Sequence, residues 1–209
     1  MATYVTLSFV MVADFGRPRD PRIDGAVLRA TVELLAETGY AGLLVSAIAK
    51  RAGTSKPAIY RRWPSKAHLV HEAVFPIDAA TAVPDTGSPV DDLREMVRRT
   101  TAVLSTPAAK AALPGLIGEM AADPTLHSAL LVRFGEIFGH GLTTWLDNAA
   151  ARGQVRADVT APELAEAIAG IVLIGLLTRP GELEPGVGDA WIDRTTTLLL
   201  KGIRKGTPQ

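Results

Sequence analysis

The sequence of 209 residues contains no cysteine. This absence excludes a disulfide-stapled scaffold and zinc sites with cysteine ligands, and it fits a reducing cytoplasm, where we expect the protein to act. The longest apolar runs, about Tyr4–Ala13 and Ala167–Leu177, are well short of the roughly 20 residues that span a bilayer, so we predict no membrane partner. The first run also lacks the basic segment and small-residue cleavage site of a signal peptide.

Motifs of common enzymes are also missing. The sequence has no G-x-S-x-G, no H-E-x-x-H and no phosphate-binding lysine loop. His68 and His71 have a spacing that two metal ligands can use, but no third ligand accompanies them and metal sites need three or four. A solvated helix face explains this pair more simply. We therefore predict a protein that is not an enzyme and that holds neither a metal nor a cofactor.

The charge is zero overall but unevenly spread. Residues 1–75 carry 10 Lys and Arg against 6 Asp and Glu, a net charge of +4, whereas residues 76–209 carry 12 against 16, a net charge of −4. A basic head on an acidic body indicates that the head alone meets nucleic acid, with chance scatter as the alternative. Basic residues also precede the head at Arg17, Arg19 and Arg22, where an arm can reach DNA or remain an exposed tail.

The stretch Leu44–Lys66 predicts two short helices joined by a tight turn. The first covers about 45–51, the glycine of the turn is Gly53, and Ser55 caps the second helix. Ile59 and Trp63 are four residues apart and face inward, which leaves the basic side chains outside. A helix-turn-helix has this shape, and cations that neutralise phosphates supply much of the affinity of such motifs for DNA.

Several motifs at fixed spacing resemble the N-terminal domain of the TetR/AcrR transcriptional regulators. They are Gly39-Tyr40, Ile48-Ala49, the run 52–56 and the run 59–66. The resemblance covers about 23–70. One position departs from it, because the family usually has Thr or Ser where this chain has Leu44. Ser46 is the nearest residue able to replace it, which would start that helix later.

The resemblance implies which residues contact DNA. Tyr60 and Lys66 match positions that bind the DNA backbone, and Lys56 or Arg61 is able to read guanine in the major groove. The full predicted set of DNA-binding residues is Ser46, Thr54, Ser55, Lys56, Pro57, Ala58, Tyr60, Arg61 and Lys66.

The rest of the chain predicts an all-α protein. Asp20-Pro21 begins a helix that Gly39 ends, and after the turn-rich segment 76–88 a cap followed by an early proline recurs at 88, 106, 123 and 160–162. Pro114 is expected to kink or split one helix, and Asp189 to cap the last. We predict an arm at 1–19, a three-helix helix-turn-helix domain at 20–75, a linker at 76–88, and a ligand-binding and dimerisation domain at 89–209. Met11 is an alternative start of the chain.

Two sets of residues in the body are predicted sites. A mostly apolar ligand pocket is expected at Met120, His127, Leu131, Phe134, Phe138 and Trp145, although their spacing describes an ordinary core equally well. The resemblance implies a homodimer through the last two helices, with an interface at Ile168, Ile171, Ile174, Leu177, Trp191, Leu198 and Leu199. The alternative is that these residues form the core of a monomer.

Together these patterns predict a homodimeric repressor that binds double-stranded operator DNA and releases it when a small apolar effector binds. Repression is implied by the resemblance alone. Two alternatives stay open. One is a ligand-binding protein or enzyme on the same fold that does not bind DNA, and the other is a non-specific DNA-binding protein without a ligand.

Overall fold

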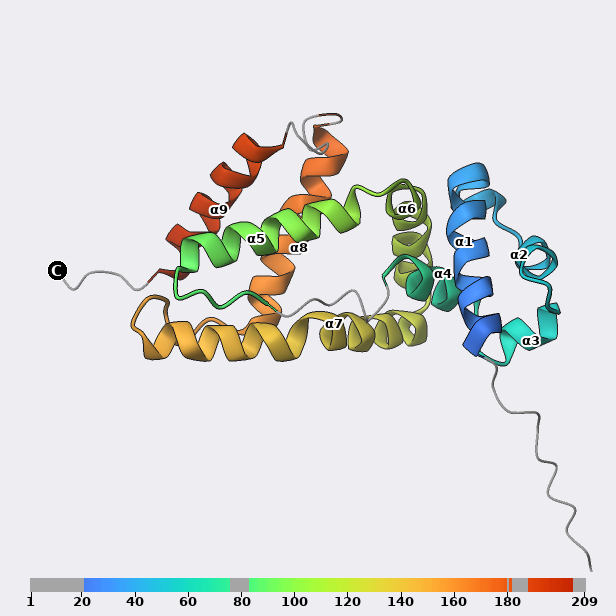
Figure 1. Ribbon diagram of the computed structural model, residues 1–209, viewed down its shortest axis with the longest axis horizontal. Helices are drawn as coiled ribbons and strands as arrows, with labels where there is room; N and C mark the ends of the chain where they lie inside the picture. The colour runs from blue at the N-terminus through green and yellow to red at the C-terminus, as the bar shows by residue number, and fades with distance from the viewer. Residues whose placement is uncertain (1–20, 76–82, 180, 182–187, 205–209) are drawn as a thin grey trace, which may run out of the picture.

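The computed structural model describes residues 21–75, 83–179, 181 and 188–204, with the backbone alone at 21, 131 and 133–140. The predicted arm at 1–19, its Arg17 and Arg19, and the cap at Asp20 lie outside these residues. The described part folds into α1 (Pro21–Gly42), α2 (Val45–Arg51), α3 (Lys56–Tyr60), α4 (Lys66–Val74), α5 (Pro89–Leu104), α6 (Pro107–Ala122), α7 (Pro124–Ala151), α8 (Ala161–Thr178) and α9 (Asp189–Ile203) (Figure 1). The prediction of an all-α protein is confirmed.

Local sequence signals fix most helix starts. Ser88, Thr106 and Asp123 each accept a backbone N–H bond at the helix they precede, and Thr160 forms a capping box with Glu163. These side chains satisfy amide groups that a helix terminus otherwise leaves unpaired. The predicted caps at these four positions are therefore confirmed.

Three predictions about helix boundaries have different outcomes. Gly39 leaves helical geometry, with φ 68° and ψ 175°, so the prediction that it ends the first helical run is confirmed, and a separate helical turn follows it to Gly42. Pro114 lies inside α6 without splitting it, and the alternative that it kinks the helix stays a prediction. The N-cap of α9 is Gly188 rather than Asp189, and Asp189 instead places its charge in the first turn, where the helix dipole favours it.

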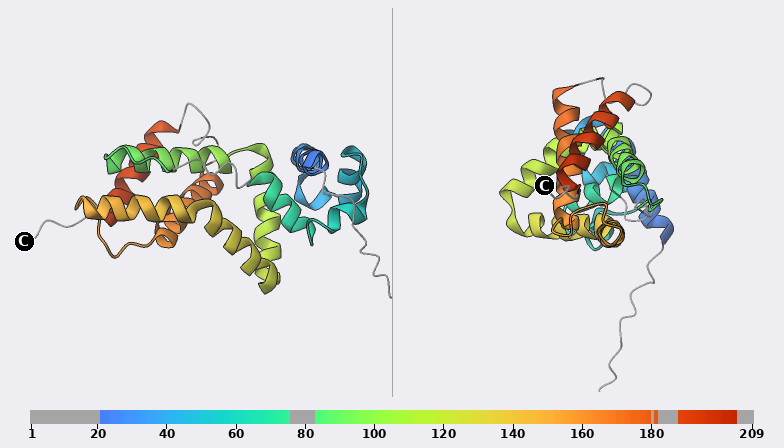
Figure 2. Two further views of the ribbon diagram at one scale, coloured as in Figure 1. Left: turned by 60° about the horizontal axis from the view of Figure 1, so that its bottom comes forward. Right: turned by 90° about the vertical axis from the view of Figure 1, so that its left-hand side faces the viewer.

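Two hydrophobic cores organise the molecule. The first is formed by α1 to α4 and also contains Ala112 and Leu116 of α6 and Leu126 and Leu130 of α7. The second joins α5, the C-terminal half of α7, α8 and α9. In Figures 1 and 2, α6 lies across the end of α7, between the small helices and the rest of the body. The head and the body therefore share the first core.

The apolar helix α8 is only partly covered by its own subunit. By length and composition it passes the test for a membrane-crossing helix, but it packs against α5 and α7 within the body, and 33% of its residues are buried. Ile174 and Leu177 are 57% and 65% exposed. The apolar composition of α8 predicts more burial than the single subunit gives it.

Candidate nucleic-acid interface

The helix-turn-helix forms as its sequence predicts. Ile48 and Ala49 of α2 are buried, and Gly53 has φ +65° in the turn. The amide of Thr54 donates to the carbonyl of Ala49 at 2.9 Å, which closes the C-terminus of α2 before the chain turns toward α3. Position 53 favours glycine because a side chain is strained in this left-handed conformation.

The second helix of the motif is fixed by a cap and two anchors. The hydroxyl of Ser55 accepts the amide N–H of Ala58 at 3.3 Å, and Pro57 falls in the first turn of α3. Ile59 and Trp63 are buried at 1% and 4% exposure. The exposed side of α3 consequently carries the polar and basic side chains of the motif.

The N-terminus of α2 differs from our expectation. The helix begins at Val45 with Leu44 as its N-cap, and no side chain caps it. Ser46 does not take over the cap, so the prediction of a later helix start is wrong. Val45 and Ile48 are both buried, and that burial holds the first turn in place without a cap. Leu44 itself is 62% exposed beside the motif.

Two of the cations in the motif are held by acids of α1. The guanidinium of Arg51 donates to both carboxylate oxygens of Glu37 at 2.6 and 3.0 Å, and Arg62 forms an ion pair with Asp24. The bond from Arg51 lowers the pKa of Glu37 below its usual value, so the pair stays charged at neutral pH. These two arginines brace the motif against α1.

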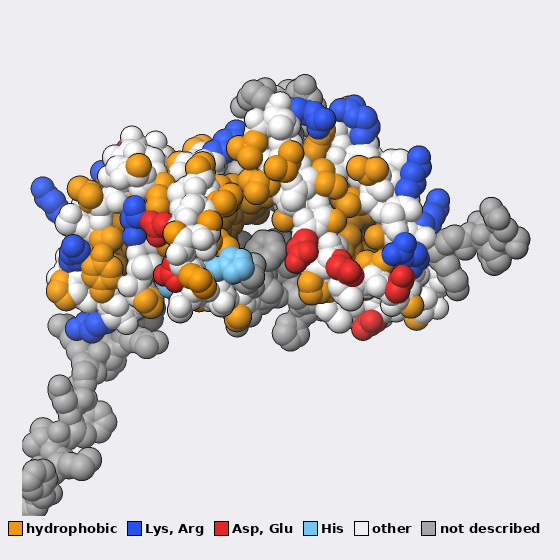
Figure 3. Space-filling model, turned by 180° about the vertical axis from the view of Figure 1, so that it is seen from behind, with side chains coloured by type: hydrophobic (Ala, Val, Ile, Leu, Met, Phe, Trp, Pro, Cys, Tyr) orange, Lys and Arg blue, Asp and Glu red, His pale blue; other side chains and the backbone are white. Residues whose placement is uncertain are grey.

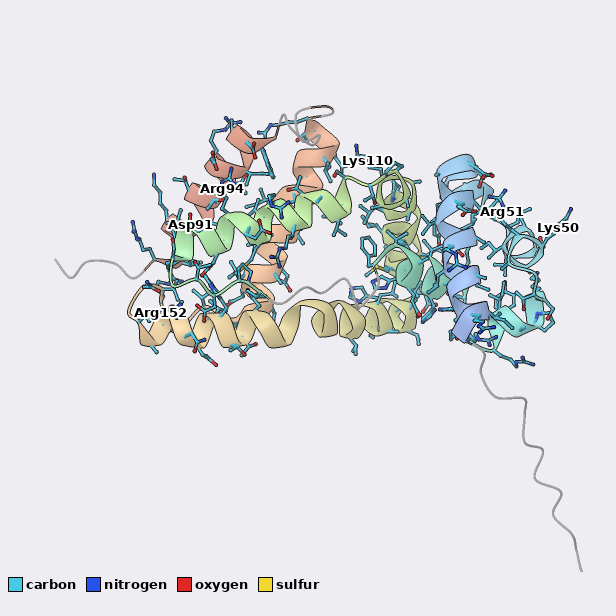
Figure 4. The ribbon with its side chains drawn as sticks, in the orientation of Figure 1. Lys50, Arg51, Asp91, Arg94, Lys110 and Arg152 are labelled. Atoms are coloured by element: carbon cyan, nitrogen blue, oxygen red, sulfur yellow. The ribbon has the colours of Figure 1, made fainter. Side chains whose placement is uncertain are left out.

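The remaining cations of the motif face outward. Lys50, Lys56 and Arg61 are exposed, and the structure gives none of them an ion pair with another described residue. In Figure 4 the side chain of Lys50 projects from α2 away from α1, whereas that of Arg51 lies toward α1. The ammonium of Lys56 lies 5.7 Å from the ring centroid of Tyr60. Lys50 was absent from the predicted DNA-binding set, but it is exposed in the same way as Lys56 and Arg61.

Lys66 is held in a different way. Its ammonium donates to the backbone carbonyl of Tyr40 at 3.2 Å and lies 4.1 Å from the ring centroid of the same residue. Lys66 is the first residue of α4, a helix capped by Ser65, and it is half-buried. Sequence reasoning missed Tyr40 because 26 residues separate it from the lysine.

The predicted DNA-binding residues come together on one part of the head. Ser46, Ser55, Lys56, Pro57, Tyr60 and Arg61 are exposed, and Thr54, Ala58 and Lys66 are half-buried. They lie on α2, on α3 with the turn before it, and at the start of α4. Their role in binding DNA stays a prediction.

The predicted pocket residues do not share one environment. Trp145 lies in the second core at 1% exposure and donates its indole N–H to Asp92 at 3.0 Å, while Met120 packs against the first core. His127 is exposed. Figure 3 shows one face of the molecule hollowed at its middle, with hydrophobic side chains above the hollow and histidine and acidic side chains on either side of it. The side chains of Leu131, Phe134 and Phe138 lie outside the described residues.

The predicted interface residues divide into two groups. Ile168, Trp191 and Leu199 are buried in the subunit's own core at 4–7% exposure, so they are not available to a partner. Ile174, Leu177 and Leu198 are 57%, 65% and 64% exposed, and Ile171 is half-buried. Only the second group forms a surface that a second subunit can cover.

The two neighbouring histidines are not on a solvated face. His71 is 6% exposed and its ring lies 5.4 Å from that of Phe75, and His68 is half-buried with its Nδ1 at 2.9 Å from the hydroxyl of Ser65. The expectation of a solvated pair is therefore wrong, because α4 packs one side against the first core. Among the described residues, no three potential ligands gather to hold a metal ion.

Comparison with known proteins agrees with this geometry. Residues 27–73 match the family model described as bacterial regulatory proteins, tetR family, and residues 83–195 match the one described as the tetracyclin repressor-like C-terminal domain. A DNA-binding transcriptional repressor TetR of Mycobacteroides abscessus is 32% identical, over 87% of this chain and 94% of the relative.

Solved structures give the same picture. A TetR family transcription regulator, SCO0332, is 31% identical and has a TM-score of 0.64 over 88% of this chain and 100% of its own. A TetR transcriptional regulator from Agrobacterium tumefaciens, at 22% identity, has a TM-score of 0.62 over 89% of this chain and 96% of its own, which shows a shared fold.

Proposed function

Because the chain belongs to the TetR family of DNA-binding transcriptional regulators, we propose that it is a homodimeric repressor that a small apolar effector releases from its operator. The observation that carries the proposal is the division of cations in the head. Arg51 and Arg62 are bound to acids of α1, whereas Lys50, Lys56 and Arg61 project outward. Exposed cations on a rigid motif are what phosphate and base contacts require.

A dimer suits this mode of binding. Helix-turn-helix dimers read two half-sites about 34 Å apart, so one head alone gives half of the recognition. The exposed apolar residues Ile174, Leu177 and Leu198 of α8 and α9 support an interface on that face of the body. In Figure 1, α8 and α9 lie on the far side of α6 from α2 and α3, so an interface there leaves both heads free for DNA.

Repression and the effector rest on different support. The relative from Mycobacteroides abscessus is named a repressor, and at 32% identity over most of both chains it favours the same sign of regulation here. The hydrophobic side chains that border one side of the hollow in Figure 3 support an apolar effector. Such a ligand releases DNA only if it binds one arrangement of the heads more tightly than the other. The proposed role requires no catalysis, and its place is the cytoplasm, where the DNA is.

Selection from a random duplex library tests the DNA-binding part. We expect the wild type to enrich one nearly palindromic site and to bind it at least about a thousandfold more tightly than scrambled DNA. Lys56→Ala should relax the preference at one position of each half-site. Lys110→Ala, which removes an exposed cation of the body, is the matched control and should leave the selected site unchanged.

Two outcomes would contradict the proposal. Equal affinity for selected and scrambled DNA would indicate a non-specific DNA-binding protein. No binding to any duplex would indicate a protein that kept the fold for another task. A panel of hydrophobic compounds added to the complex with the selected site tests the effector, because none of them releasing DNA would remove the ligand from the proposal.

A further inference from the structure

Tyr40 occupies a close contact between the head and α6. The backbone leaves helical geometry at Gly39, and the ring of Tyr40 then packs against α6 at 8% exposure. A Cβ atom added at Gly115 would lie 2.1 Å from Cδ1 of this ring, far inside van der Waals contact. The ring therefore fills the space that any other residue at position 115 would need.

The same tyrosine holds Lys66. The lysine ammonium bonds to the carbonyl of Tyr40 at 3.2 Å and lies over its ring at 4.1 Å from the centroid. Both contacts fix an otherwise flexible side chain that has three donors, and only one donor is used by the carbonyl. The other two remain for an anion, and the half-buried stem of Lys66 limits where the ammonium can go.

We propose that Tyr40 is a positioning residue, through which the place of α6 sets the place of the Lys66 ammonium on the DNA backbone. The inference rests on the proposed function, in which Lys66 binds a phosphate. Because Gly115 meets the ring without a side chain between them, a displacement of α6 toward the head displaces the ring. The ammonium then loses its cation–π interaction and is held by the carbonyl of Tyr40 alone, which fixes its direction less tightly.

The surroundings of the Tyr40 hydroxyl keep it protonated, so the contact with α6 does not change with pH. Burial raises the pKa of Tyr40, and the carboxylate of Glu119, also on α6, raises it further. The hydroxyl therefore stays protonated throughout the physiological range. The ring faces Gly115 and Glu119 on α6 and Lys66 on α4, so it touches both elements that the proposal connects.

Gly115→Ala tests the inference with a control on the same helix. A Cβ atom added at Gly118 has no other atom within 4 Å. Gly118→Ala therefore raises the helix propensity of α6 as much as Gly115→Ala does, but it does not touch the ring. Affinity for the duplex selected by the wild type is measured by fluorescence anisotropy between about 50 and 200 mM salt. Gly115→Ala should weaken binding about tenfold and flatten the salt slope by about 0.9 for each phosphate that the protein no longer neutralises. Gly118→Ala should behave as the wild type.

The Lys66→Met background shows whether the effect passes through the lysine. There, Gly115→Ala should cause no further loss of affinity and no further change of slope. An equal loss with and without Lys66, or an unchanged salt slope, overturns the inference. If circular dichroism shows that Gly115→Ala does not fold, Tyr40→Leu replaces it, since this change removes the ring without a clash. Tyr40→Leu must then also cause no further loss of affinity in the Lys66→Met background. A wild type that binds no duplex overturns the proposed function together with this inference.

Discussion

Asp92 is a fully buried carboxylate whose partners lie on two other parts of the body. It accepts from the amide and hydroxyl of Thr86, at 3.0 and 2.8 Å to Oδ1, and from the indole of Trp145 at 3.0 Å to Oδ2. A buried carboxylate is stable only when donors replace the water that surrounded it in the unfolded chain. The side chain therefore ties the loop before α5 to α7.

Trp145→Phe removes one of these donors. A hydrogen bond to a charged group contributes about 1.5–3 kcal/mol, and the smaller ring leaves a cavity that costs about 1 kcal/mol more. We expect the free energy of unfolding to fall by roughly 2.5–4 kcal/mol, the sum of these two contributions. Urea unfolding followed by far-UV circular dichroism measures this change without relying on tryptophan fluorescence.

A double-mutant cycle with Asp92→Ala separates the two contributions. Without the carboxylate, Trp145→Phe removes no hydrogen bond, so it should cost about 1 kcal/mol or less. The water-accessible Thr86 can bond to solvent in both backgrounds. If Trp145→Phe costs the same free energy with and without Asp92, the hydrogen bond does not stabilise the fold and the reasoning is refuted.

Three further predictions concern other parts of the chain. Leu44→Ser should add the missing cap of α2, because φ −108° and ψ 128° suit an N-cap, and should raise stability by about 1 kcal/mol and Tm by about 2–4 °C, whereas Leu44→Ala should not. Arg98 and, to a lesser extent, Arg99 lower the pKa of Glu95 from 4.5 to about 2. The ionised Glu95 therefore stabilises the fold fully above about pH 4.5, and this stabilisation is lost as the pH falls through 2. After discounting for solvent screening, Glu95→Gln should therefore be about 1 kcal/mol less stable than the wild type in urea unfolding at about pH 7. If the difference in the free energy of unfolding between the two proteins does not become smaller in acid, this prediction is contradicted. Ile174→Asp should convert a dimer to monomers in sedimentation, while Val132→Asp, equally apolar and 65% exposed on α7, should not; two equal sedimentation profiles would remove α8 from the interface.

Sequence reasoning succeeded where the determining interactions are local. The cap at Ser55, the turn glycine Gly53 and the capping box of Thr160 each depend on residues within four positions of one another. The composition of the cap and the first turn is enough to place such a helix start. The starts of α3 and of α5 to α8 followed for this reason.

It failed where the partner is distant in the chain. Trp145 and Asp92 are 53 residues apart, and nothing in the spacing of either indicates the other. Helical periodicity also finds an apolar face without saying what covers it. Trp191 and Leu199 pack into the subunit's own core while Leu198, their neighbour on the same helix, is exposed.

The contact between Tyr40 and Gly115 also constrains how this protein can change in evolution. A mutation that places a side chain at position 115 meets the ring at 2.1 Å, so it should persist only after position 40 has become smaller. When position 40 becomes smaller first, the intermediate protein contains a cavity beside Gly115. Such a cavity destabilises the fold less than a clash of this size when the neighbouring side chains can relax. Among relatives that share this packing, we expect an aromatic residue at 40 with glycine at 115, or smaller residues at 40 with alanine or larger at 115. The two positions should therefore change as a pair, and position 40 should change first.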